Sequence, residues 1–350
     1  MYFASDNTSG LPPEIMAAIA AANEGYALGY GNDTLSIRLR DRIRVVFEAP
    51  EAEICLVTTG TAANALALAT LTPPWGAIYC HGLAHIEVDE CGAPEFFTGG
   101  AKLVHVAGDN GKMTPEALAA KLAVAGRGVV HSVQPAALSL TNLTECGTLY
   151  SPAEIRALAD IALAHGLAVH LDGARFANAL VAADATPAEL SWRAGVEALV
   201  LGGTKNGLMG VEAVVVFDPA HAWELQLRRK RAGHLWSKHR FLAAQMLAWL
   251  EDDLWLRLAA HANAMAATLE VGLAPHAEML FAREGNMIFA RWPRGLHRQM
   301  QARGAQYYLW PEGETLEGQE GEMVSARLVS SWSTTPEQVE AFLGLFEGGG

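Results

Sequence analysis

The chain has 350 residues, 51% of them hydrophobic and 18% charged, which is typical of a folded globular protein and excludes a disordered one. This length is enough to bury a large core and predicts two domains. With 25 basic against 38 acidic residues the formal net charge is −13, which argues against non-specific binding to nucleic acid or to anionic membranes.

The N-terminal segment lacks the basic and apolar regions of a signal peptide, and the most apolar stretch, residues 60–71, is too short to span a bilayer. The four cysteines lie far apart without a CxxC pair, which indicates reduced thiols and neither a disulfide framework nor a zinc cage. We therefore expect a cytoplasmic protein without a metal site.

Short β-rich runs alternate with amphipathic helical patterns between residues 54 and 218. The predicted strands are 54–57, 77–80, 102–106, 128–133, 168–171, 198–201 and 213–217. Ser151 and Glu154 form a capping box that opens a predicted helix over 152–165, and Thr186 with Glu189 repeats this start signal. The alternation predicts an α/β fold with a mainly parallel sheet that helices cover on both faces.

After about residue 232 the pattern changes. A long helical pattern runs from 241 to about 271, with no proline or glycine before Gly272. Short predicted strands follow at 286–292, 307–310 and 324–331, and a capped helix begins after Thr335. We expect a large domain over residues 1–245 and a smaller C-terminal α/β domain over 246–350, with the terminal glycines 348–350 frayed.

A lysine, Lys205, stands in the turn GGTKNG at 202–207, directly after a predicted strand. One interpretation is a surface lysine in a glycine-rich loop. The other is a lysine held at the end of a rigid element, with its amine partly desolvated so that it can be neutral and nucleophilic. A pyridoxal 5′-phosphate (PLP) enzyme needs such a lysine to hold its cofactor as a Schiff base.

An aspartate, Asp172, ends the predicted strand at 168–171 and precedes Gly173. Taken alone, an Asp-Gly pair is most simply a capped turn. In an open parallel sheet, however, ligands bind at the carboxyl ends of the strands, so Asp172 and Lys205 would face one site. There the carboxylate would pair with the protonated ring nitrogen of PLP and keep the ring electron-poor.

The segment TTGTAAN at 58–64 places Gly60 and Thr61 at a strand end where a helix begins. Backbone N–H groups at such a helix start bind phosphate, although simple capping by Thr59 or Thr61 explains the segment equally well. The segment lacks the spacing of a P-loop or of a dinucleotide fingerprint.

Two histidines, His81 and His85, lie near carboxylates and are compatible with a metal site. Gly82 and the mixed pattern around it do not favour a helix that presents both rings on one face. Stacking of the His85 ring on a pyridine ring is the better interpretation.

Together these segments resemble the L-threonine aldolase family of fold-type I PLP enzymes, which have the aspartate aminotransferase-type fold. The resemblance extends over most of the chain. Further segments that carry it are SDNTSG at 5–10, YGND at 30–33, AHI at 84–86, HLDGAR at 170–175 and ARLVSSW at 326–332. The resemblance implies PLP in the first domain and a homotetramer, built from dimers whose partners complete each other's active sites.

The resemblance also implies roles for individual residues. The catalytic residues are Lys205, His85 and Asp172. The cofactor contacts are Gly60, Thr61, His85, Asp172, Arg175, Thr204 and Lys205. The substrate contacts are Ser9, Arg175 and Arg327 on the carboxylate, and Tyr30 from across the subunit interface. The basic run at 229–231 would approach the phosphate of a neighbouring subunit through a residue that the sequence does not single out.

One departure from the family concerns the β-hydroxyl base. Some members carry a Glu-Asn-Thr-His segment whose histidine faces the substrate, whereas residues 139–145 here read SLTNLTE. This is closer to the bacterial low-specificity and phenylserine-aldolase branch. The base therefore stays open among His85, His131 and a water molecule.

The predicted reaction is reversible cleavage of L-threonine, L-allo-threonine or a related β-hydroxy-α-amino acid to glycine and an aldehyde. A phenylserine-preferring aldolase, and a PLP-dependent β-eliminating lyase or aminotransferase, remain alternatives because they need the same lysine and aspartate. An idle PLP-binding regulatory protein is the alternative outside enzymes. The products distinguish these possibilities.

Overall fold

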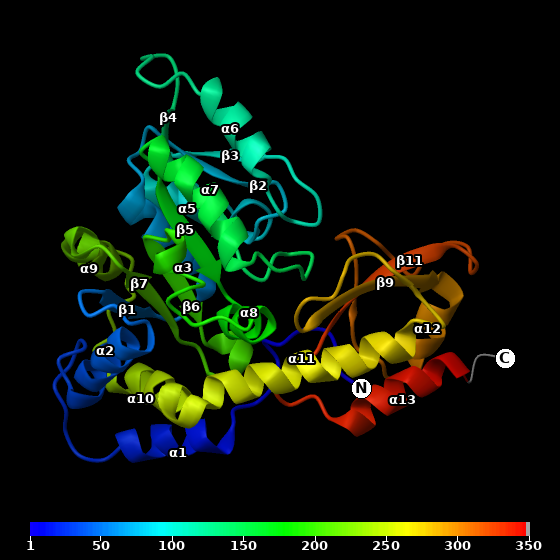
Figure 1. Cartoon of the computed structure of the whole chain (residues 1–350). Helices are drawn as coiled ribbons and strands as arrows, with labels where there is room; N and C mark the ends of the chain where they lie inside the picture. Colours follow the sequence, from blue (N-terminus) through cyan, green and yellow to red (C-terminus); the bar gives the residue numbers. More distant parts are fainter. Residues whose placement is uncertain (348–350) are drawn as a thin grey trace.

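The computed structural model describes residues 1–347, so the terminal glycines 348–350 lie outside the described residues, and it contains two β-sheets (Figure 1). The larger sheet has the strand order β1-β7-β6-β5-β4-β2-β3. Its strands are β1 (Glu53–Val57), β2 (Gly76–His81), β3 (Lys102–Val106), β4 (Gln134–Thr141), β5 (Ala168–Gly173), β6 (Ala198–Gly202) and β7 (Glu212–Val216). In this sheet only β7 runs against the common direction, because β7 pairs antiparallel with both β1 and β6.

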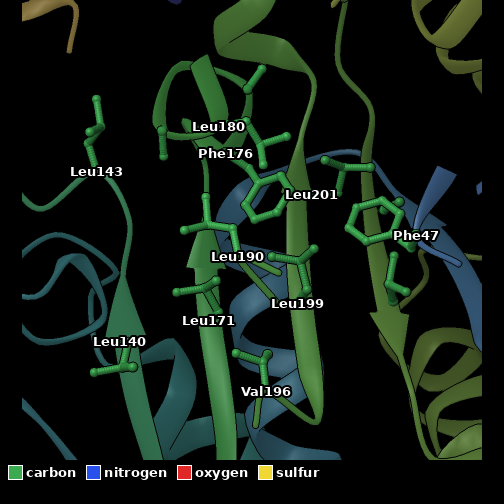
Figure 2. Close-up of a cluster of buried hydrophobic side chains, with 14 of the residues drawn as sticks. Phe47, Leu140, Leu143, Leu171, Phe176, Leu180, Leu190, Val196, Leu199 and Leu201 are labelled. Carbon is green, nitrogen blue, oxygen red and sulfur yellow. The ribbon is translucent and has the colours of Figure 1, made fainter. Parts of the chain in front are cut away.

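Alternate side chains of these strands face two separate cores, as the period of two in a strand requires. On one face Cys55 and Val57 of β1 pack against α3 (Gly60–Leu71) and α9 (Ala222–Arg231). On the other face Leu56 joins a core with α2 (Thr34–Val46), α7 (Pro152–Ala164), α8 (Phe176–Ala183) and α10 (Arg240–Leu250). Figure 2 shows part of this second core, where Leu171 of β5 and Leu199 of β6 lie with Phe176 of α8.

The smaller sheet is antiparallel and has the order β10-β11-β9-β8. Its strands are β8 (Glu278–Met279), β9 (Met287–Pro293), β10 (Tyr308–Leu309) and β11 (Met323–Val329). Helix α11 (Leu254–Leu273) extends from the larger sheet to the smaller one, where α12 (Arg294–Ala302) and α13 (Pro336–Glu347) lie (Figure 1). The proposed domain boundary after residue 245 stays a prediction.

The N-terminal arm, residues 1–12, packs on the smaller sheet although it precedes the larger one in sequence. The Phe3 ring lies in the core of the smaller sheet, and the Val329 N–H donates to the Phe3 carbonyl at 2.8 Å.

The remaining elements precede α11 in the chain. They are the helices α1 (Pro13–Ala22), α4 (His85–Val88), α5 (Ala93–Thr98) and α6 (Pro115–Ala123), and the 3₁₀ turns η1 (Trp192–Ala194), η2 (Thr204–Asn206), η3 (Pro219–His221) and η4 (Glu251–Asp253). Within residues 1–347, none of the helices combines the length and the hydropathy that crossing a bilayer requires.

The predicted strand at 128–133 is wrong, because the strand begins at Gln134 and ends at Thr141. Positive φ angles of 66° at Gly126 and 76° at Gly128 shape a loop over the residues that the β-rich pattern selected. Proline cannot donate to the ladder, so Pro135 is unfavourable inside a strand. The sheet accommodates Pro135 at a bulge, where Ala77 pairs with Pro135 but Ile78 pairs with Ala137.

The predicted long helix over 241–271 is two helices, α10 and α11. Asp252 and Asp253 separate them with φ angles of 49° and 53°, a left-handed backbone that aspartate tolerates better than most residues. The apolar pattern continues on both sides of this break, so periodicity alone does not reveal it.

The start signal at Thr186 forms its capping hydrogen bonds with Glu189, but no α-helix follows it. Ser191 instead donates its hydroxyl to the Pro187 carbonyl, a local bond that competes with helix formation. In contrast, the capping box at Ser151 and Glu154 opens α7 as predicted.

A buried histidine, His297, packs inside the smaller sheet's core. Its ring stacks on Trp292 with centroids 4.2 Å apart, its Nε2 donates to the Val324 carbonyl at 3.0 Å, and the Tyr307 hydroxyl lies 2.9 Å from Nδ1. Burial lowers the pKa of His297 from its ordinary value near 6.5 to about 4. Below pH 6.5 the histidine of the unfolded chain is protonated, whereas that of the folded chain stays neutral down to about pH 4. The free energy of unfolding therefore falls as the pH falls through this window.

We expect His297→Phe to lose less stability than the wild type between pH 7 and pH 5. The difference should be about 2 kcal/mol, the free energy that this depressed pKa adds to the pH dependence over that interval. Urea unfolding of both proteins at the two pH values measures it, with His131→Gln, a change at an exposed histidine, as the control. Equal losses in wild type and His297→Phe would contradict the prediction.

Candidate active site

The carboxyl ends of the strands of the larger sheet open into a cavity of about 270 Å³. Asp172 reaches it from β5, Lys205 from the turn after β6, and Thr58 from the end of β1. The cavity is lined by Asn7, Thr58, Thr59, Gly60, Thr61, Asn64, His85, Thr141, Leu143, Glu145, Asp172, Ala174, Arg175, Thr204, Lys205 and Glu212. The structure therefore brings all the predicted cofactor contacts together around one space.

Two glycines let the ends of β5 and β6 approach closely. A Cβ on Gly173 would lie 2.4 Å from the Val200 carbonyl oxygen, and a Cβ on Gly202 would lie 2.5 Å from the Ala174 carbonyl oxygen. Both contacts are with backbone and cannot be relieved by a rotamer change. The glycine after Asp172 and the glycine three residues before Lys205 are thus required for the ends of β5 and β6 to lie this close.

The Asp172 carboxylate is buried, and its two oxygens have different partners. The Asn64 amide donates to Oδ2 at 2.9 Å, and the Ala174 N–H donates to Oδ1 at 2.9 Å. Burial opposes ionisation, but the positive charge of His85 and the Ala174 N–H outweigh it, and the pKa of Asp172 lies below its ordinary value. Asp172 is therefore an anion at neutral pH and can face a cationic group in the cavity.

A network of side chains surrounds Asp172. Asn64, one turn into α3 from Gly60, also donates to Glu90 Oε1 at 2.8 Å, and the same oxygen lies 2.8 Å from His85 Nδ1. Burial alone would lower the pKa of His85, but the Glu90 hydrogen bond and the charge of Asp172 raise it above its ordinary value.

The atoms of His85, Glu90 and Asp172 that could ligate a metal ion lie within 4.8 Å of one another, close enough to suit such an ion. The hydrogen bonds among them and Asn64 already account for this closeness. Asn64 and Glu90 were not singled out from the sequence. Asn64 lies inside the segment 58–64 that carries the resemblance, and its helical spacing from Gly60 was the available signal, whereas Glu90 lies four residues beyond the segment 84–86.

Lys205 stands on the 3₁₀ turn η2, which neighbouring elements hold in place. Asn206 donates its amide to the Trp255 carbonyl at 2.8 Å and accepts from the Trp249 indole at 3.1 Å. The Glu212 carboxylate of β7 accepts the Gly203 N–H at 2.6 Å, and burial raises the pKa of Glu212. Within residues 1–347 no hydrogen bond or ion pair holds the Lys205 amine. A free amine on a rigid turn suits a nucleophile.

The first turn of α3 faces the same cavity. Thr59 caps this helix by accepting the Ala62 N–H at 3.1 Å, as the capping interpretation predicted. Gly60 and Thr61 still line the cavity, and a Cβ built on Gly60 meets no atom within 4 Å. The Thr59 hydroxyl caps the helix, while Gly60 and Thr61 face the cavity. Capping and anion binding are therefore compatible here.

Arg175 is held by Asp6 of the N-terminal arm in a buried ion pair. Its Nε donates to Asp6 Oδ2 at 2.7 Å and its Nη2 donates to Oδ1 at 3.0 Å, and Asn286 adds a hydrogen bond to the same carboxylate at 3.0 Å. Burial opposes ionisation of Asp6, but Arg175 lowers the pKa of Asp6 below its ordinary value. This edge of the Arg175 fork is occupied, which leaves Nη1 for another anion.

Arg327 lies on β11 next to this ion pair. Burial and the positive charge of Arg175 lower the pKa of Arg327 below its ordinary value. Its Nε is buried and lacks a hydrogen-bond partner in the described part of the chain. A buried guanidinium with an unsatisfied donor is costly unless an anion completes it.

Other predicted residues do not line the cavity. Ser9 is half-buried in the arm, and Tyr30 is 50% exposed, with its ring 5.2 Å from the Lys230 amine. His131 is exposed and precedes β4, at the opposite edge of the sheet from the site. Arg229 is buried in its own chain, where it contacts Gln226 and His239, so it is not the residue of the basic run that would reach a neighbour.

The topology and the site define an α/β enzyme of the aspartate aminotransferase type, with a lysine and an aspartate at the carboxyl edge of the sheet. The Beta-eliminating lyase family model matches residues 2–291. The chain is 42% identical over 339 residues to a low specificity L-threonine aldolase of Pseudomonas aeruginosa, covering 96% of this chain and 94% of that one. A second such relative, from a Pseudomonas species, is 40% identical with the same coverage.

Solved structures agree with this fold. A threonine aldolase of Leishmania major superposes with a TM-score of 0.91 at 27% identity and covers 99% of both chains. A serine palmitoyltransferase of Sphingomonas wittichii shares the fold at 15% identity, with a TM-score of 0.72 over 99% of this chain and 86% of that one. The chain belongs to the beta-eliminating lyase family, within its L-threonine aldolase group. The predicted family, fold class and lyase class are confirmed.

We expect Asp6→Asn to lower the free energy of unfolding by about 3–5 kcal/mol, because it leaves the buried Arg175 charge without its partner. Urea unfolding measures the loss. Glu48→Gln, which removes the partner of Arg193 from a half-exposed pair, is the control and should change stability little. A loss for Asp6→Asn no larger than that of the control would show that the buried pair does not stabilise the fold.

Proposed function

We propose that the protein is a PLP-dependent aldolase that reversibly cleaves L-threonine, L-allo-threonine or related β-hydroxy-α-amino acids to glycine and an aldehyde. The observation that carries this proposal is the convergence of Lys205 and Asp172 from adjacent strand ends onto one cavity, in a chain of the threonine aldolase group. The proposed substrate class rests on the Pseudomonas relatives, which are named low specificity L-threonine aldolases.

The residues around the cavity fit PLP. Asp172 is an anion suited to the protonated ring nitrogen, Lys205 offers a free amine for the Schiff base, and Gly60 and Thr61 offer a helix N-terminus to the phosphate. Thr204 lines the cavity beside Lys205, and His85 would cover one face of the ring. When bound, PLP supplies an electron-poor ring that accepts the electron pair released from the Cα–Cβ bond.

The substrate carboxylate would bind the two arginines. Arg327 offers its unpaired Nε, and Arg175 offers Nη1 while Asp6 holds its other edge. Two fixed guanidinium groups would orient the amino acid about Cα and so select the Cα–Cβ bond for cleavage. Ser9, in the same arm as Asp6, would add a contact.

A homotetramer with shared active sites is part of this proposal and would account for the remaining assignments. Tyr30 is half-exposed and its N–H donates to the Ser237 carbonyl at 3.1 Å, which ties its loop to the segment that follows α9. With Arg229 buried, Lys230 and Arg231 remain exposed in that run and available to a neighbouring subunit's phosphate. A cytoplasmic location remains part of the proposal.

The products of threonine distinguish the candidate activities. We expect the purified protein with PLP to release glycine and acetaldehyde in equal amounts from L-threonine, and an aryl aldehyde from a β-aryl serine. A keto acid with ammonia would instead indicate β-elimination, and a requirement for an amine acceptor would indicate an aminotransferase. Absence of any product from PLP-loaded protein would favour a regulatory role.

Lys205→Ala should abolish the visible absorption of the lysine-bound cofactor and lower cleavage by more than about 10³-fold, because the amine that forms the Schiff base is lost. Absorption spectroscopy and aldehyde release measure the two effects. Lys121→Ala, on the surface helix α6, serves as the matched control. Retention of both absorption and turnover in Lys205→Ala would refute the assignment.

A further inference from the structure

We propose that the carboxylate of Glu145 accepts the β-hydroxyl proton of the substrate as the Cα–Cβ bond breaks. This inference rests on the proposed aldolase function and supplies the base that the sequence left open. It follows from the position, the rigidity and the unpaired state of this side chain.

Glu145 lies on the loop that follows β4. From residue 142 to residue 148 every side chain except that of Glu145 is buried. Glu145 is half-exposed and lines the same cavity as Lys205 and Arg175. Its exposure is thus explained by the cavity into which the loop presents it.

Hydrogen bonds hold the loop on both sides of Glu145. The Thr144 N–H donates to the Thr148 carbonyl at 2.9 Å, the two threonine hydroxyls lie 2.7 Å apart, and the Gly147 N–H donates to the Thr144 carbonyl at 2.9 Å. The Thr148 hydroxyl also donates to the Asn110 carbonyl at 2.6 Å. A base needs a fixed position relative to the proton it removes, and this loop provides one.

Three acidic residues line the cavity, and only Glu145 lacks a hydrogen-bond partner within residues 1–347. Asp172 accepts from Asn64 and Ala174, and Glu212 accepts from Gly203. No hydrogen bond or ion pair within the described chain engages the Glu145 carboxylate. Its oxygens are therefore available to a ligand.

Glu145 lines the cavity together with Arg175 and His85, at the end where the proposed function puts the substrate. It lies close enough to Arg175, Arg327 and His85 to stabilise the cationic forms of all three. An amino acid whose carboxylate binds these arginines brings the substituents of its Cβ into the same region.

The two histidines that the sequence left open as the base are less suited. His131 is exposed at the opposite edge of the sheet. Both ring nitrogens of His85 face carboxylates, Nδ1 that of Glu90 at 2.8 Å and Nε2 that of Asp89 at 3.4 Å. Its raised pKa also favours the cationic form, which cannot accept a proton.

The proposed step is balanced. The hydroxyl proton moves to a Glu145 oxygen, the O–H electron pair forms the carbonyl of the aldehyde, and the Cα–Cβ pair stays with Cα. Cα then takes up one proton to give glycine, and Glu145 releases the one it accepted. No oxidant, reductant or further reactant is needed.

Glu145→Gln tests the step because it keeps the shape of the side chain and removes the basic oxygen. We expect threonine cleavage to fall by about 10²–10⁴-fold. Exchange of the glycine α-proton with deuterated solvent, which involves no hydroxyl, should stay within about threefold of the wild type. The glycine Kd from calorimetry should show that binding is retained.

Glu284→Gln is the matched control, because Glu284 accepts the Leu149 N–H near the same loop and glutamine keeps that acceptor. It should cleave threonine like the wild type. Glu145→Asp, which keeps the carboxylate, should recover part of the activity if the variant with glutamine is inactive for lack of a base.

Two results would overturn the role of Glu145. One is cleavage by Glu145→Gln close to the wild-type rate. The other is a parallel fall of cleavage, proton exchange and glycine binding, which would indicate a structural role. If the wild type exchanged the glycine proton but cleaved no β-hydroxy amino acid, the proposed function itself would fail.

Discussion

The buried carboxylate of Asp172 must stay ionised at the edge where the parallel strands end, and much of the site is arranged around this constraint. Removing a carboxylate from water opposes its ionisation strongly. Here the positive charge of His85 and the hydrogen bonds from the Asn64 amide and the Ala174 N–H offset the cost of burying the charge. Glu90 in turn stabilises the cationic form of His85 through its hydrogen bond. The beginning of α3 therefore contributes to the cavity twice, through Gly60 and Thr61 in its first turn and through Asn64 one turn later.

A second constraint joins the two parts of the chain. The N-terminal arm pairs with the smaller sheet at Phe3, and three residues later Asp6 holds Arg175 of the larger part. Asn286, which precedes β9, shares the Asp6 carboxylate. The arm thus fixes Arg175 beside Arg327, so the position of one arginine relative to the other depends on a buried ion pair.

The sequence predicted the features that follow from strand ends. Asp172 directly follows an apolar run, and Lys205 lies in the short turn after another. Parallel strands bring such residues to one edge, so their proximity was predictable without a structure. Arg327, more than 100 residues further on, was reached only through the family resemblance.

What the sequence did not reveal depends on contacts between distant segments or on local backbone choices. The partners of Asn64 and Asp6 lie 26 to 280 residues away. The break at Asp252 and the bulge beside Pro135 leave the apolar pattern unchanged, so periodicity missed both. Tyr30 lies outside the cavity of a single chain, and its predicted contact requires a neighbouring subunit.

The most direct measurement is to reduce the PLP-loaded protein with borohydride and locate the modified residue by peptide mass spectrometry. We predict a single pyridoxyl group on the peptide that contains Lys205, and none after the same treatment of Lys205→Ala. A pyridoxyl group on any other lysine, or none in the wild type, would contradict the assignment of this cavity as the cofactor site.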